Sequence, residues 1–86
     1  MKKRIGIISI VIYKIEKAKL VNSLLSEYFS YILSRNGLPL RDKDVHIINV
    51  VIQATMDDIN SLTGKLGRLE DVEVKCLLTK IEVEDE

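Results

Sequence analysis

Residues 45–54, VHIINVVIQA, form a run of β-branched and aliphatic side chains that leads into Thr55 and a short amphipathic segment. At the strand period of two, the run divides into a purely apolar face with Ile48, Val50, Ile52 and Ala54 and a mixed face with Ile47, Asn49, Val51 and Gln53. A mixed face is too apolar for open water and too polar for an ordinary core. We therefore expect a central strand with helices on one side and a further partner on the other.

Residues 4–12 repeat this pattern, with Ile8, Ile10 and Ile12 on one face and Ile5, Ile7, Ser9 and Val11 on the other. Two strands of matching length and pattern are expected to lie side by side at the centre of one sheet. We expect these two central strands to be parallel, because a helical crossover follows the first of them.

The remaining elements follow from periodicity and from turn residues. A helix is expected from about Lys14 or Glu16 to Phe29, and a short edge strand over residues 31–36 that ends at Gly37-Leu38-Pro39. A charged loop at 40–44 leads to the strand at 45–54. Thr55 and Asp58 indicate a capped second helix that ends near Gly67, and Val72–Lys80 forms the last strand. The acidic tail, residues 82–86, is expected to be frayed.

This order predicts an α+β protein with the ferredoxin-like βαββαβ fold, a four-stranded antiparallel sheet with two helices on one face. Residues 1–86 are expected to form a single domain. We expect Ile8, Ile10, Ile48, Val50, Ile52, Val74, Cys76 and Leu78 to pack against Leu20, Leu24, Leu25, Ile59, Leu62 and Leu66.

The composition narrows the classes of partner. With 13 basic and 13 acidic residues the formal net charge is zero, which argues against direct nucleic-acid binding. The apolar run at 5–12 is far shorter than the roughly 20 residues needed to span a bilayer, and charged residues follow it at once. We expect a cytoplasmic protein without a membrane segment.

Few residues suggest catalytic or metal chemistry. Thr63-Gly64-Lys65 lacks the upstream glycine and the following hydroxyl residue of a phosphate-binding loop. His46 and Cys76 are the only residues of their kinds, and Cys76 is expected to be a small core residue. We therefore expect no enzyme, no cofactor and no stoichiometric nickel, zinc or iron.

Several segments resemble one small family of proteins assigned to regulation of the iron-only hydrogenase system. They are KRI at 3–5, VNSLLSEY at 21–28, YILSRNGLP at 31–39 and LTGKLGRL at 62–69. The similarity extends from Lys3 to about Lys80. It implies an ACT-like domain akin to the C-terminal domain of the nickel-responsive repressor, which assembles as dimers and tetramers. The several histidines of that repressor and its separate DNA-binding domain have no counterpart here.

Two functions fit these observations: a regulatory module that binds a small effector between subunits of a homodimer or homotetramer, or a structural oligomerisation domain without a ligand. The first would use Asn49, Gln53, Thr55, Gly37 and Gly64 as ligand-binding residues. In either case the interface is expected on the face away from the helices, with Ile5, Ile7, Ser9, Val11, Ile47, Val51 and Leu77.

Overall fold

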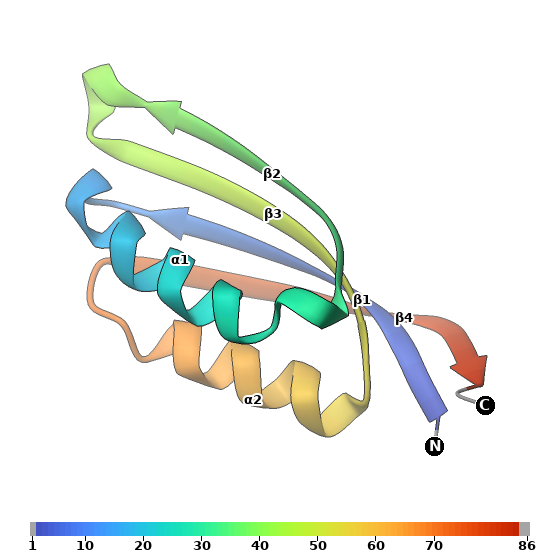
Figure 1. Cartoon of the computed structure of the whole chain (residues 1–86). Helices are drawn as coiled ribbons and strands as arrows, with labels where there is room; N and C mark the ends of the chain where they lie inside the picture. Colours follow the sequence, from blue (N-terminus) through green and yellow to red (C-terminus); the bar gives the residue numbers. More distant parts are fainter. Residues whose placement is uncertain (1, 85–86) are drawn as a thin grey trace.

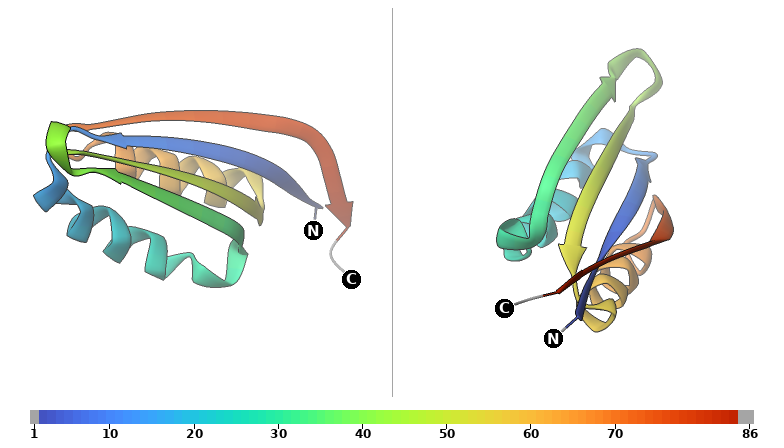
Figure 2. Two further views of the ribbon diagram at one scale, coloured as in Figure 1. Left: turned by 90° about the horizontal axis from the view of Figure 1, so that it is seen from above. Right: turned by 90° about the vertical axis from the view of Figure 1, so that its right-hand side faces the viewer.

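The computed structural model describes residues 2–84, which form one layer of four strands and one layer of two α-helices (Figure 1). Short 3-10 turns precede and follow the first helix, and a third joins β2 to β3. The elements are β1 (Lys2–Ile12), α1 (Ala18–Glu27), β2 (Ile32–Leu40), β3 (Val45–Ala54), α2 (Met56–Gly67) and β4 (Val72–Glu84). Both helices cover the same face of the sheet, and the other face carries no element (Figure 2).

The sheet has the strand order β2-β3-β1-β4, so β1 and β3 are central as expected. All three neighbouring pairs are antiparallel. The expectation that β1 and β3 run parallel is therefore wrong. After the crossover through α1, β2 runs in the same direction as β1 but does not pair with it. The tight turn at Arg41–Lys43 then reverses the chain, so that β3 runs antiparallel between β1 and β2.

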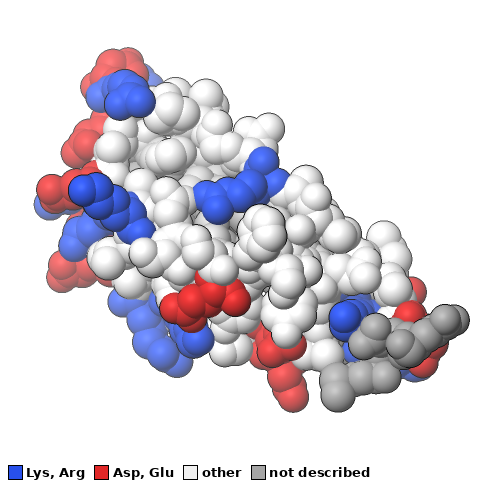
Figure 3. Space-filling view, viewed as in Figure 1, with Lys and Arg blue, Asp and Glu red and all other residues white. Residues whose placement is uncertain are grey.

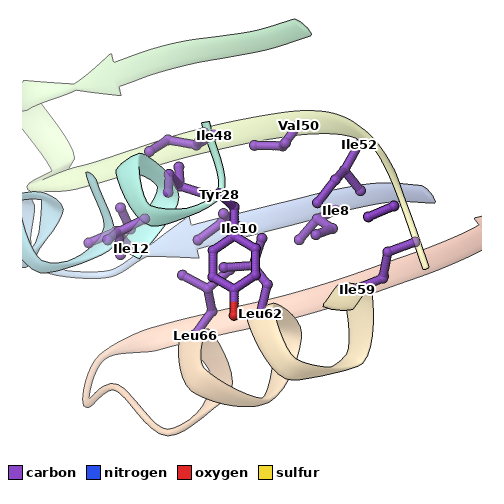
Figure 4. Packing of buried hydrophobic residues seen from close by; sticks show 13 residues of the cluster. Ile8, Ile10, Ile12, Tyr28, Ile48, Val50, Ile52, Ile59, Leu62 and Leu66 are labelled. Carbon is purple, nitrogen blue, oxygen red and sulfur yellow. The ribbon is translucent and has the colours of Figure 1, made fainter. Parts of the chain in front are cut away.

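The core lies between the sheet and the two helices, as Figure 4 shows. Alternate residues of the central strands point into it, which follows from the strand period. Its fully or almost fully buried members are Ile8, Ile10, Ile12, Val21, Leu25, Tyr28, Ile48, Val50, Ile52, Ala54, Ile59, Leu62 and Leu66.

Two residues expected in the core are exposed. Leu20 is 50% exposed, because the buried stripe of α1 runs through Val21 and Leu25. Cys76 is also exposed, although it pairs with the buried Ile8. It lies on the edge strand β4, where only one neighbouring strand is present to shield it.

Polar contacts join the two helices across the surface of this core. The Tyr28 hydroxyl lies 3.2 Å from the Ser61 hydroxyl, to which it donates, and the Lys65 ammonium lies 5.3 Å from the Tyr28 ring centroid. Lys65 also pairs with Glu27 at 3.7 Å. The Tyr28 hydroxyl interaction and the nearby Glu27 raise the pKa of Lys65. Tyr28 thus combines apolar burial with a polar connection between α1 and α2.

The edge strands are longer than the sequence patterns indicated. β2 does not end at Gly37-Leu38-Pro39 but continues through these residues to Leu40. An edge strand tolerates a proline whose missing N–H faces away from the ladder. β4 continues to Glu84, so residues 82–84 of the expected frayed tail are paired with β1. Residues 85 and 86 of that tail lie outside the described residues. The pairing shifts between Arg4 and Gly6, where the Thr79 hydroxyl donates to the Ile5 carbonyl at 2.6 Å.

Two aspartates with left-handed backbone conformations hold the connection from β1 to α1. Asp44 (φ 58°) accepts a hydrogen bond from the Ile15 N–H at its Oδ1 atom, at 3.1 Å. Asp71 (φ 64°) accepts one from the Tyr13 N–H at its carbonyl, at 2.7 Å. Aspartate tolerates this conformation better than most side chains do.

The start of α2 is capped as the sequence indicated. Thr55 Oγ1 accepts a hydrogen bond from the Asp58 N–H at 3.2 Å and donates to the Asp58 carboxylate at 3.1 Å. Replacing Thr55 by alanine is expected to lower the free energy of unfolding by about 1 kcal/mol, because the first turn loses its cap. Thr55→Ser, which keeps the oxygen, should remain close to the wild type in urea denaturation. An equal loss in both variants would contradict this role.

Candidate functional site

The sheet face away from the helices, here called the outer face, is the main candidate for a functional surface. The residues that precede and follow each buried residue along β1 and β3 point to the outer face, because strand side chains alternate. The strand register places all seven predicted interface residues there: Ile5, Ile7, Ser9, Val11, Ile47, Val51 and Leu77. Six of them are partly exposed and Leu77 is 63% exposed, so the monomer leaves a wide apolar surface on this side.

A line of polar side chains crosses the middle of the outer face. The register pairs Asn36 with Asn49, Asn49 with Ser9, and Ser9 with Lys75, so each of the four strands contributes one residue. We call this line the polar row. The Ser9 hydroxyl donates to the Asn49 Oδ1 atom at 2.8 Å, which directs the asparagine amide N–H groups elsewhere.

Apolar side chains lie on both sides of the polar row. One flanking row contains Leu38, Ile47 and Val11 and ends at Glu73 on β4. The other flanking row runs through Ser34, Val51, Ile7 and Leu77. A partner covering this face would bury the polar row between two apolar rows, and its amide and hydroxyl groups would then need partners of their own.

Asn36 and Lys75 were not among the predicted site residues. The strand alternation places Lys75 on the same face as Leu77, which means that the sequence alone could have identified Lys75 as an outer-face residue. Asn36 could be found only by pairing β2 with β3 around the turn at Arg41–Lys43. Their contribution to the polar row is therefore a result of the strand register.

The predicted ligand-binding residues do not converge on one place. Gln53 shares the outer face with Asn49 but lies four residues along β3, roughly 13 Å away. The Thr55 hydroxyl is engaged in the helix cap. Gly37 pairs with Ile48 and so belongs to the helix-covered side, where a Cβ atom would lie 3.2 Å from His46 Nε2. Gly64 is in α2, in the other layer.

A surface hollow of about 240 Å³ lies where β1 begins, lined by Lys2, Lys3, Arg4, Met56 and Glu82. The Arg4 guanidinium contacts the Glu82 carboxylate at 3.0 Å, and the Lys2 ammonium lies 3.5 Å from it. The hydrogen bond from Arg4, with the charge of Lys2, lowers the pKa of Glu82. Glu82 therefore pairs with two of the cations, Lys2 and Arg4, that a bound anion would need.

The helix side of the molecule carries basic and acidic side chains intermixed, without a broad patch of one sign (Figure 3). Among residues 2–84, no helix is long and apolar enough to cross a membrane. Within the same range, no three histidine, cysteine or acidic side chains form a group suited to a metal ion. Cys76 is exposed, but partial desolvation raises the pKa of its thiol, which lowers its thiolate fraction at neutral pH.

These features define a class: a small α+β domain with a ferredoxin-like antiparallel sheet and one uncovered sheet face. Divalent ion tolerance protein CutA1 from Ehrlichia chaffeensis shares this fold, with a TM-score of 0.50 and 14% identity over 92% of this chain and 84% of that chain. Among curated protein sequences, none matches the chain.

The chain belongs to the TM1266-like family, whose description reads "Iron-only hydrogenase system regulator, putative" and whose model matches residues 4–76. The uncharacterized protein TM1266 from Thermotoga maritima has a similar structure, with a TM-score of 0.85. It is 40% identical, and the match covers 91% of this chain and 99% of that chain. The predicted family resemblance is thereby confirmed.

Proposed function

We propose that this protein is a regulatory module of the iron-only hydrogenase system that works as an ACT-like homo-oligomer and binds a small effector between subunits. The family description supports the regulatory role. The ferredoxin-like fold with one uncovered sheet face supports the comparison with ACT-like domains. The observation that carries the proposal is the polar row in the middle of an otherwise apolar outer face.

The apolar part of the outer face supports assembly. A domain of 86 residues buries only about 60 to 65% of its unfolded surface, so additional apolar burial has a large relative effect on its stability. Ile7, Val51 and Leu77 form one continuous apolar row across three strands. Covering this row with the same row of a second subunit would remove it from water and stabilise both copies.

The polar row supports a ligand at the same interface. Asn49 and Asn36 each offer amide N–H donors and a carbonyl acceptor, and Lys75 adds a positive charge. Between two sheets these groups would line a polar layer enclosed by apolar rows, which is the usual character of a small-molecule site. The lysine favours an effector that carries an anionic group.

The alternative is a structural oligomerisation domain without a ligand, and one contact favours it. The Ser9 hydroxyl and the Asn49 Oδ1 atom already pair through their 2.8 Å hydrogen bond. The polar row would then serve to set the alignment of the subunits rather than to bind an effector.

Thermal shift against amino acids, nucleotides and metal ions separates the two functions. A ligand at 100 times its Kd should stabilise the protein by about 2.7 kcal/mol, which is readily visible as a rise in Tm. The rise should disappear in Asn49→Ala and persist in Asn60→Ala, a matched change on the exposed side of α2. An oligomer that no compound stabilises would favour the structural alternative.

A further inference from the structure

The end of β4 carries a bulge that sets its last three described residues apart from the rest of the strand. Between the pair of Gly6 with Leu78 and the pair of Arg4 with Glu82, β1 contributes only Ile5, whereas β4 contributes the three residues 79–81. Such an insertion bends the strand that carries it. The end of β4 turns sharply in this region (Figure 2). We call residues 79–81 the bulge and residues 82–84, which pair with the start of β1, the strap.

One side chain holds the bulge in its conformation. The Thr79 hydroxyl donates a hydrogen bond to the Ile5 carbonyl at 2.6 Å and accepts one from the Ile81 N–H at 3.1 Å. These two hydrogen bonds serve backbone groups at the point where the regular pairing of β1 and β4 is interrupted. A single hydroxyl, rather than regular strand pairing, therefore fixes the position at which the strap leaves the rest of β4.

The strap is fastened to the start of β1 by one carboxylate. Glu82 contacts the Arg4 guanidinium at 3.0 Å and the Lys2 ammonium at 3.5 Å. Both contacts lie at the surface, because the side chain of Glu82 is 45% exposed and that of Lys2 is 67% exposed. Exposed ion pairs contribute little to stability, and another anion can compete for the same cations. The contact that fastens the strap is therefore a weak one.

The hollow beside the strap has the size and charge to take a small anion. Its volume is about 240 Å³, and its lining consists of Lys2, Lys3, Arg4, Met56 and Glu82. The lining carries two more positive charges than negative ones, although the chain as a whole has a net charge of zero. Arginine and lysine bind the oxygens of phosphate and carboxylate groups through charge-assisted hydrogen bonds. Within the chain, the carboxylate of Glu82 already makes such contacts.

We propose that the hollow is a binding site for a small oxyanion, and that the Glu82 carboxylate takes the place of this ligand while the site is free. An incoming anion displaces Glu82 from Arg4 and Lys2, and the strap then separates from the start of β1 with the bulge as its hinge. The site lies at one end of the sheet, away from the polar row, so it does not depend on the proposed effector site.

Titration with inorganic phosphate, followed by NMR of the backbone amides of Arg4 and Met56, tests the binding site. Glu82→Gln removes the competing carboxylate and should bind phosphate about three- to tenfold more tightly than the wild type. Glu84→Gln is the matched control, because it removes the same charge from the strap at a residue that does not line the hollow. Its affinity should stay within about twofold of the wild type at physiological salt. A gain for Glu82→Gln no larger than that for Glu84→Gln, or no binding by any of the three proteins, would overturn the site.

Hydrogen exchange of the wild type with and without saturating phosphate tests the strap. The backbone amides of residues 82–84 should exchange at least about threefold faster with phosphate bound, while those of residues 72–78 keep their rates. Thr79→Val keeps the shape of the side chain but removes the hydroxyl, so it should speed exchange in residues 82–84 by roughly two- to tenfold without phosphate. Amides of the strap that exchange equally fast with and without phosphate, or only together with residues 72–78, would overturn the release of the strap. A Thr79→Val protein that exchanges like the wild type would overturn the hinge.

Discussion

Replacing Val51 by lysine is expected to convert the proposed oligomer into a monomer and to lower its Tm. Val51 lies between Ile7 and Ser34 in the apolar row of the outer face. Each aliphatic side chain withdrawn from water contributes about 1.5 to 3 kcal/mol, and a lysine there would add an unpaired charge to the interface. Because a symmetric dimer carries the change twice, association should weaken by at least about 100-fold.

Light scattering after gel filtration measures this loss directly as a decrease in molar mass. Ser23→Lys is the matched control, because it adds the same charge at an exposed position of α1 on the opposite side of the molecule. It should keep the wild-type mass and Tm. If Val51→Lys and the wild type have the same mass and the same Tm, the outer face is not the interface.

Replacing Leu25 by alanine should destabilise the domain by about 2 to 5 kcal/mol. Leu25 is fully buried in the core cluster beneath the central strands, so the shorter side chain leaves a cavity that the surrounding residues fill only in part. In a domain of this size such a loss corresponds to a decrease in Tm of at least about 10 °C. Thermal unfolding followed by circular dichroism at fixed protein concentration measures it.

Leu20→Ala is the same substitution on the same helix at a position that is 50% exposed. Its cost should stay below about 1 kcal/mol, because half of the side chain is already in water and no cavity forms. A comparable loss of stability in the two variants would mean that α1 buries a different face from the one described.

The order of elements and the positions of the central strands could be predicted from periodicity alone. The alternation in β1 and β3 identifies the buried face, and the hydroxyl of Thr55 marks the start of α2. The direction of β3 relative to β1 was predicted wrongly, because the alternation of side chains is the same in parallel and antiparallel strands. The reversal depends on the turn at Arg41–Lys43, whose charged residues show no strong turn motif.

The predicted interface residues share one face for the same reason that the core residues do: both sets follow from the strand period. The predicted ligand-binding residues do not converge, because the type of a residue does not reveal the layer in which it lies. Gly64 lies in the helix layer and Gly37 on the helix-covered side of an edge strand. The exposure of Cys76 likewise depends on its place at the sheet edge.

The sequence by itself determined the buried faces of β1, β3 and α2, because side-chain direction repeats with a fixed local period along a strand or helix. It also determined the family, through segments such as residues 62–69 that the matched family model includes. The tertiary structure alone decided which residues of different strands lie beside one another. Register depends on pairings between residues far apart in the chain, and only those pairings bring Asn36, Asn49, Ser9 and Lys75 into one row.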